Sequence, residues 1–307
     1  MKRQLLIAEF LATPWAMMPE RLAAFATVLS RWSAGSSRAM EDDEVAEGRH
    51  SFDARRAQAQ GRAGSGAISV LPLYGAVVQR ANLATDICGG TSTQQFTAAF
   101  RDAMSDDSIG AVLIDIDSPG GSVYGVGELA AEIIEARSRK PVVGLANSLA
   151  ASAAYWIGCS CSELFVTPGG EVGSIGVWQA HEDWSKAMEE AGVKTTLISA
   201  GKYKVEGNPY QPLGEEAQTF MQSRVDDYYT VFTKAVAKGR GVGIAQVRGG
   251  MGEGRVLGAD AALAQNMVDG VMTFDDVVRK MQRDMKTRRD PSASRRAAAE
   301  RDLLLLG

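Results

Sequence analysis

A serine set among alanines is the side chain of this sequence best placed for nucleophilic chemistry. Ser152 lies in the stretch NSLAASAAYWIG, residues 147–158. A serine at the start of a helix is most often an N-cap. The same position, however, directs its own amide or that of Ala153 toward the place where an oxyanion would form. The residues alone leave both interpretations open, a helix cap and a nucleophile.

A glycine pair follows the apolar run AVLIDI and precedes a helical pattern. In DSPGGSVYG, residues 117–125, Pro119 favours a turn, and Gly120 and Gly121 let another group approach the backbone closely. Amides at such a position can be the second donor to an oxyanion. A phosphate loop is the competing interpretation, but neither GxxxxGK[ST] nor GxGxxG is present. A plain turn remains the alternative.

A serine nucleophile needs a base, and this chain has two histidines, His50 and His181. His50 falls in an expected linker, and His181 lies in the polar stretch QAHEDW, typical of a solvated surface. A lysine can replace histidine when burial disfavours its ammonium form, as in known Ser–Lys sites. Lys202 and Lys204, in SAGKYKVEGNPYQPLG, are the candidates, with solvated loop lysines as the alternative interpretation.

Composition excludes several classes of function. Of 307 residues, 45% are hydrophobic and 23% charged, and the formal charge is −4, so nucleic acid is not the expected partner. Three cysteines with two histidines are too few for a disulfide framework or a zinc site. We expect no metal, no cofactor, and cysteines that are buried small residues in a reducing compartment.

The N-terminus imitates a signal peptide, with two cations before an apolar run. Glu9 interrupts that run, which is far shorter than the roughly 20 residues that span a bilayer. We expect no membrane span and no export. Residues 3–32 are expected to form amphipathic helix, broken near Pro14 and Pro19.

The chain divides by composition into four parts. A Ser-, Gly- and charge-rich stretch predicts a flexible linker, and the basic end predicts a solvated helical tail rather than a nucleic-acid arm. The predicted parts are an N-terminal helical segment 1–32, a linker 33–66, a central domain 67–282 and a basic tail 283–307.

Apolar runs alternate with helical patterns in the central part, which predicts an α/β fold. Several runs are apolar on both faces, as in parallel strands covered by helices. Strands are predicted at 67–75, 111–116, 141–146, 163–167, 174–178 and 194–199, and helices at 91–106, 122–138, 152–160, 182–191 and 214–238.

Five motifs in one order resemble the S49 serine peptidases. They are DSPGG, AASAAYW, GSIGV, GKYK followed by NPY, and GEGRVLGADAALAQNMVDGV. The resemblance covers about residues 67–280 and is to the signal peptide peptidase A group and the head-maturation proteases of tailed bacteriophages. It implies an α/β fold, a ClpP/crotonase-like spiral of ββα units, here preceded by an N-terminal helical segment.

The resemblance also implies roles for single residues. Ser152 matches the family's nucleophile and Lys204 its general base, with Lys202 in a variable position. Gly120 and Gly121 match the oxyanion hole, to which Ala153 adds the amide inferred above. The sequence departs from the family at Ala153–Ala154, which is often Gly–Gly, and at Asn208–Pro209–Tyr210, which is more usually Ser–Pro–Phe.

The N-terminal segment and its polar linker resemble the front of head proteases of the lambda protein C type. This implies a phage or prophage prohead protease that cleaves scaffold, portal or capsid proteins in the host cytoplasm and procapsid. Single-domain members can form homo-oligomeric rings whose active sites are shared between subunits. Self-cleavage in the exposed stretches 33–66 and 283–300 is a further hypothesis.

Four other functions remain open. They are a cytoplasmic signal-peptide-peptidase-like protease that degrades peptides, a crotonase-type enzyme acting on acyl thioesters, a non-catalytic capsid-assembly component, and a peptidase that uses Ser152 with His181.

Overall fold

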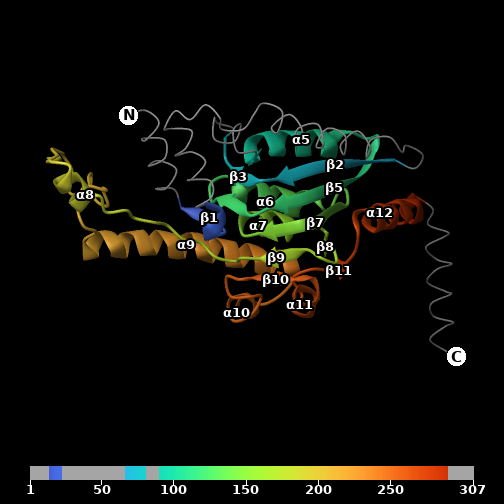
Figure 1. Cartoon of the computed structure of the whole chain (residues 1–307). Coiled ribbons are helices and arrows are strands. Elements are labelled where there is room, and N and C mark those ends of the chain that lie inside the picture. Colours follow the sequence, from blue (N-terminus) through green and yellow to red (C-terminus); the bar gives the residue numbers. More distant parts are fainter. Residues whose placement is uncertain (1–13, 23–65, 81–89, 290–307) are drawn as a thin grey trace, which may run out of the picture.

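The computed structural model describes residues 14–22, 66–80 and 90–289, and it is built on two β-sheets (Figure 1). The larger has the order β10-β9-β7-β5-β2, with β8 beside β7 and β11 beside β8. Its pairs are parallel except β9 with β10. Its strands are β2 (Ala67–Tyr74), β5 (Ile109–Ser118), β7 (Val142–Ala151), β8 (Glu163–Val166), β9 (Glu171–Gly173), β10 (Val256–Gly258) and β11 (Gly270–Val271).

The smaller sheet has the order β1-β6-β3-β4. β3 pairs in parallel with β4 and β6, whereas β1 pairs antiparallel with β6. Its strands are β1 (Trp15–Met17), β3 (Ala76–Val78), β4 (Gly90–Ser92) and β6 (Gly120–Ser122).

Two units of the chain consist of a long strand, one or two short strands and a helix, and a third keeps the long strand and the helix. β2, β3 and β4 lead to α5 (Thr93–Ser105), and β5 and β6 lead to α6 (Val126–Ala136). In the third unit β7 passes directly into α7 (Ala153–Gly158). This repetition confirms the predicted α/β spiral of ββα units.

The long strands are buried on both faces. In β5, Val112 and Ile114 face the main core with α5, α6 and α7, whereas Leu113 belongs to a second cluster with Met281. Met281 lies on α12 (Phe274–Arg289), which covers the opposite face. Apolar residues on both sides of a strand therefore did indicate a sheet covered by helices.

An exposed arm, residues 181–214, projects from the body at the start of α9 (Glu215–Arg240; Figure 1). It carries the short helix α8 (Ser185–Glu190), and none of its residues is buried. Its outgoing and returning stretches touch where Trp184 N donates to Pro209 O at 2.8 Å. The remaining helices are α9 (Glu215–Arg240), α10 (Ile244–Arg248) and α11 (Ala259–Ala264).

Two predicted strands are wrong. Residues 194–199 have no strand partner in the described part of the chain, because they lie on the arm. Residues 174–178 form a single bridge, from Trp178 to Trp15, because the strand of that region is β9 and ends at Gly173.

The chain ends also differ from expectation. The described part of the predicted N-terminal helix contains strand β1, and helix is present at 19–22, because Pro14 and Pro19 bracket the strand. The predicted boundary at residue 282 falls inside α12, where Met285 is buried. Most of the linker and the end of the tail lie outside the described residues. Within those residues, no helix has the length and apolarity to cross a bilayer.

Candidate active site

Ser152 occupies the sharp junction between β7 and α7. Its backbone has φ 56° and ψ −118°, a conformation that costs a non-glycine residue about 1–3 kcal/mol. Two bonds hold it: Ser152 N donates to Gly173 O at 2.7 Å, and Ser152 O accepts from Trp156 N at 2.9 Å. The hydroxyl makes no capping bond to α7 and lies 3.4 Å from Gly176 O. The helix-cap interpretation therefore does not account for this serine.

The glycine pair lies in β6, directly against Ser152. Gly120 has φ +97°, and a Cβ there would lie 2.9 Å from Ser152 Cβ. A Cβ on Gly121 would lie 1.8 Å from Val77 O, inside the main chain of β3. Both positions thus require glycine for close approach of other backbone. The Gly120 amide donates to Ser118 Oγ at 3.2 Å.

Ala153 is the first residue of α7 and is fully buried. An amide in the first turn of a helix has no carbonyl partner within that helix. The fold therefore brings three of the predicted site residues together, Ser152, Gly120 and Ala153, with Gly121 next to them in β6.

The candidate bases lie on the arm, apart from that group. Lys204 is exposed, and its amide donates to Gly201 O at 3.2 Å. His181 Nε2 lies 3.1 Å from Asn208 O, also on the arm. The described chain thus does not place Lys204 at the buried serine, and the base remains a prediction.

Lys202 is unsuited to act as a base. Its amine contacts the Tyr203 hydroxyl at 2.5 Å and the Glu216 carboxylate at 3.1 Å. The hydrogen bonds to Tyr203 and then Glu216 raise the pKa of Lys202, which favours the ammonium form. Of the two lysines, Lys204 is the better candidate.

Polar and aromatic contacts of Tyr155 and Trp156 hold α7 in place. Tyr155 donates its hydroxyl to Met267 O at 2.9 Å, and burial raises its pKa, which keeps it a neutral donor. Trp156 stacks on Phe232 of α9, with ring centroids 4.6 Å apart and 8° between planes. The ring contact joins the helix that follows the serine to the C-terminal half of α9, and the Tyr155 bond joins it to the segment between α11 and β11.

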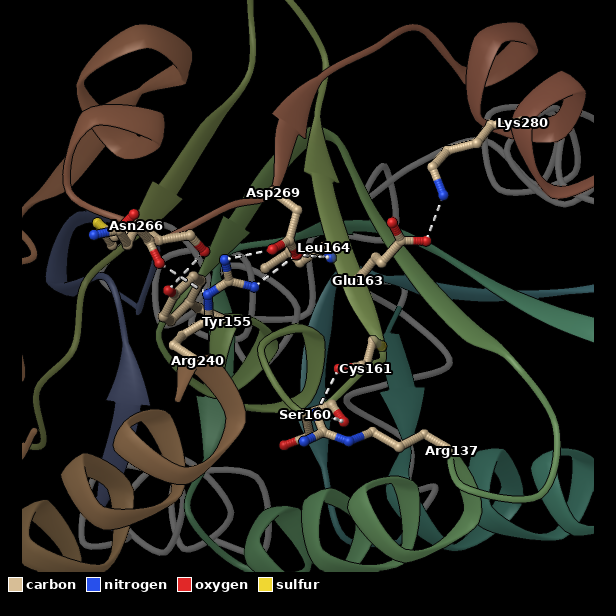
Figure 2. Close-up of polar contacts among 11 residues, drawn as sticks. Arg137, Tyr155, Ser160, Cys161, Glu163, Leu164, Arg240, Asn266, Asp269 and Lys280 are labelled. Carbon is tan, nitrogen blue, oxygen red and sulfur yellow. Dashed lines mark hydrogen bonds and ion pairs between the residues drawn. The ribbon is translucent and has the colours of Figure 1, made fainter. Parts of the chain in front are cut away.

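Arg240, whose side chain is 8% exposed, extends these contacts to β8 (Figure 2). Arg240 forms a two-pronged pair with Asp269, at 2.7 and 2.9 Å, and donates to Asn266 O at 2.9 Å. Asp269 also accepts from Leu164 N at 2.7 Å. In the same view Arg137 donates to the Cys161 carbonyl at 2.7 Å, which fixes the turn after α7.

The described cysteines are structural. Cys159 and Cys161 are buried and free, and burial raises the pKa of Cys159 to about 12 and also raises that of Cys161. Cys88 and His50 lie outside the described residues. Among those described, no group of three or more His, Cys, Asp and Glu side chains could hold a metal ion.

The sequence did not reveal that strand β1 would lie at the site. Its register pairs Ala16 with Gly121 and Met17 with Gly120. A Cβ built on Gly120 would lie 2.3 Å from Ala16 O. The available signal was a short apolar run, WAMM, between two prolines, which excludes a long helix but does not identify a distant partner.

The model of peptidase family S49 matches residues 134–288, which include the serine, the arm and α9. The chain belongs to peptidase family S49. Among curated proteins, it is 34% identical over 214 residues to the head-tail preconnector protein GP5 of Enterobacteria phage P21, covering 70% of this chain and 42% of that protein. It is 32% identical over 233 residues to the capsid assembly protease C of Escherichia phage lambda, covering 76% and 53%. The chain thus spans about half the length of these relatives.

Solved structures show a weaker similarity. A mutant of the 1510-N membrane-bound stomatin-specific protease aligns with a TM-score of 0.46 at 16% identity, over 71% of this chain and 86% of that one. Another mutant of the same protease, in complex with a substrate peptide, aligns at 0.45 and 16%, over 70% and 80%.

Proposed function

We propose that this S49 peptidase is a serine endopeptidase in which Ser152 is the nucleophile and Lys204 of a neighbouring copy is the general base. The observation that carries the proposal is the conformation of Ser152. Its strained backbone is held beside Gly120, and its hydroxyl is not used to cap α7. Strain of this kind persists where surrounding structure enforces it, and catalytic nucleophiles are a common site for it.

The proposed reaction follows acyl transfer through the serine. The uncharged amine of Lys204 takes the hydroxyl proton as Ser152 Oγ attacks the scissile carbonyl carbon. Amides of Gly120–Gly121 and Ala153 stabilise the oxyanion. The lysine then gives its proton to the leaving amine, and water hydrolyses the resulting ester to free the serine.

The exposed arm supports a site shared between subunits. It has no buried residue, yet it exposes Trp184, Ile198 and Tyr203, the isoleucine at 95%. Apolar side chains gathered on a projecting segment are typical of a protein interface. A second copy that covers the arm would shield Lys204 from water and bring it to its own Ser152, and repetition of this contact would close a ring.

The relatives support a role in phage head maturation. One is named a capsid assembly protease and the other a head-tail preconnector protein. We propose that this peptidase acts in the procapsid and the host cytoplasm, where it would cleave scaffold, portal or capsid proteins. Self-cleavage in 33–66 and 283–300 belongs to the same proposal.

Complementation between inactive variants tests the shared site. Ser152→Ala and Lys204→Ala are each expected to lose at least about 1,000-fold in peptide hydrolysis and in fluorophosphonate labelling. Mixed oligomers regain some activity, because one interface in the mixture pairs an intact serine with an intact lysine. Failure of the mixture to recover, while each variant still assembles, would contradict sharing.

Replacement of the other bases completes the test. Lys202→Ala and His181→Ala are expected to keep most of the activity, since neither is the proposed base. If His181→Ala loses activity while Lys204→Ala stays active, the general base is His181 and not Lys204. An unlabelled Ser152 in the assembled wild type would favour a non-peptidase function.

A further inference from the structure

Strand β1 lies between two stretches of backbone that flank the candidate nucleophile. On one side it pairs antiparallel with β6, with Met18 N donating to Pro119 O at 3.2 Å and Val123 N to Pro14 O at 3.3 Å. On the other side Trp15 and Trp178 exchange two bonds, of 2.9 and 3.0 Å. An extended segment held on both edges is how a peptide adds to strands by main-chain bonds.

The backbone of β1 crosses the site at Ala16. The Ala16 carbonyl oxygen lies 2.3 Å from the point where a Gly120 Cβ would stand, and Ser152 Cβ is 2.9 Å from that point. The serine itself is only 1% exposed. The Ala16 carbonyl, Gly120 and Ser152 therefore lie close together. Solvent has almost no access to Ser152.

The side chains of β1 are buried on both faces of the strand. Trp15 and Met17 share one face and are buried with Leu22 and Ala76 against Trp178. The indole of Trp178 also donates to Met17 O at 2.8 Å. Ala16 points to the opposite face, where it is fully buried in the main core. Strand β1 therefore presents a small residue between two bulky apolar ones.

We infer that residues 14–18 occupy the substrate groove of this peptidase as an internal pseudo-substrate, which an extended protein segment must displace before Ser152 can act on it. The inference rests on the proposed peptidase function and names the segment that controls access to its site. Because β1 belongs to the same chain, its effective concentration at the groove is on the order of millimolar. A substrate that competes with it should share its pattern of a small residue between bulky apolar ones.

The test measures binding in a protein that cannot cleave. In a Ser152→Ala background, a fluorescent peptide copying residues 13–20 is titrated into the full chain with and without Trp15→Ala. Loss of the Trp15 side chain weakens the internal strand, so the peptide should bind at least about tenfold tighter, because apparent affinity scales with the fraction of open grooves. A peptide with Phe in place of Ala16 should bind more weakly to the same protein.

A control variant, a second β1 variant and a labelling measurement complete the test. Met281→Ala is the same change as Met17→Ala but at a buried position of α12 against the larger sheet, and it should leave peptide binding unchanged. Met17→Ala is the second, milder variant if Trp15→Ala does not fold. Equal binding with and without the β1 substitutions would overturn the inference. In the Ser152-containing chain, faster fluorophosphonate labelling of Trp15→Ala reports on catalysis separately, so absent labelling with enhanced binding would sink the peptidase proposal alone.

Discussion

The Cα of Gly120 and the Cβ of Ser152 face each other across the gap between β6 and the start of α7. A methyl group on the glycine would lie 2.9 Å from the serine Cβ and 3.0 Å from Ala151 O. The absence of a side chain at one residue therefore sets how closely the glycine strand approaches the serine.

Gly120→Ala should reduce peptidase activity strongly and lower the stability of the protein only modestly. The φ of +97° adds strain of roughly 1–2 kcal/mol, and the displaced strand no longer presents its amides, a loss of about 100-fold or more in kcat. Peptide hydrolysis and thermal unfolding measure the two effects. Gly169→Ala is the control, since a Cβ there meets nothing within 4 Å. An active Gly120→Ala enzyme would remove β6 from the oxyanion site.

Two phenylalanines of α9 should behave in opposite ways. Phe232 stacks on Trp156, so Phe232→Ala should lower the free energy of unfolding by about 3–5 kcal/mol. Phe220 is 54% exposed near the arm, so Phe220→Ala should change it by less than about 0.5 kcal/mol but weaken self-association. Denaturant unfolding and sedimentation velocity distinguish these effects. Equal losses of stability would contradict the described burial.

The ionised Asp269 carboxylate should stabilise the folded state at pH values above its pKa in the unfolded chain. Burial opposes its ionisation, but hydrogen bonds from Arg240 and the Leu164 amide outweigh this, so the pKa of Asp269 is lowered. The stabilisation is present above an unfolded pKa of about 3.9 and is lost as the pH falls through the folded value.

Asp269→Asn tests this dependence. At neutral pH it should cost about 2–3 kcal/mol, less than the value for a fully buried pair because the Asp269 side chain is 36% exposed. The difference from wild type should shrink as urea unfolding is repeated toward about pH 3. Asp275→Asn, on the exposed start of α12, is the matched control. A difference that stays constant with pH would rule out the ion pair as the cause.

The two described cysteines should resist alkylation in the folded protein. Burial raises the pKa of Cys159 to about 12 and raises that of Cys161, so neither forms the reactive thiolate at neutral pH. Iodoacetamide should modify both after denaturation and neither before it, as measured peptide by peptide with mass spectrometry. Rapid modification of the native chain would show that α7 opens readily.

The central strands were predictable because burial on both faces leaves an unmistakable apolar run. The runs at 67–75, 111–116, 141–146 and 163–167 became β2, β5, β7 and β8. The position of Ser152 at the start of a helix also followed from its neighbours. Local pattern is sufficient where the sheet covers both faces of a segment.

Segments whose partners lie elsewhere were not predictable in the same way. Residues 194–199 have the composition of a strand but lie exposed on the arm, so their pattern gives a tendency to pair without naming a partner. Strand β1 is three residues long, and its partner β6 follows about one hundred residues later. A pairing over that separation depends on the assembled sheet rather than on local preference.

The arm has a consequence for the timing of proteolysis. Lys204 is exposed on the arm and Ser152 is buried in the body of the chain, so under the shared site proposed above a lone chain would be inactive. Dilution would lower the activity, and assembly of many copies on a growing shell would raise it. The geometry of one projecting loop would then tie the onset of cutting to the density of assembled neighbours.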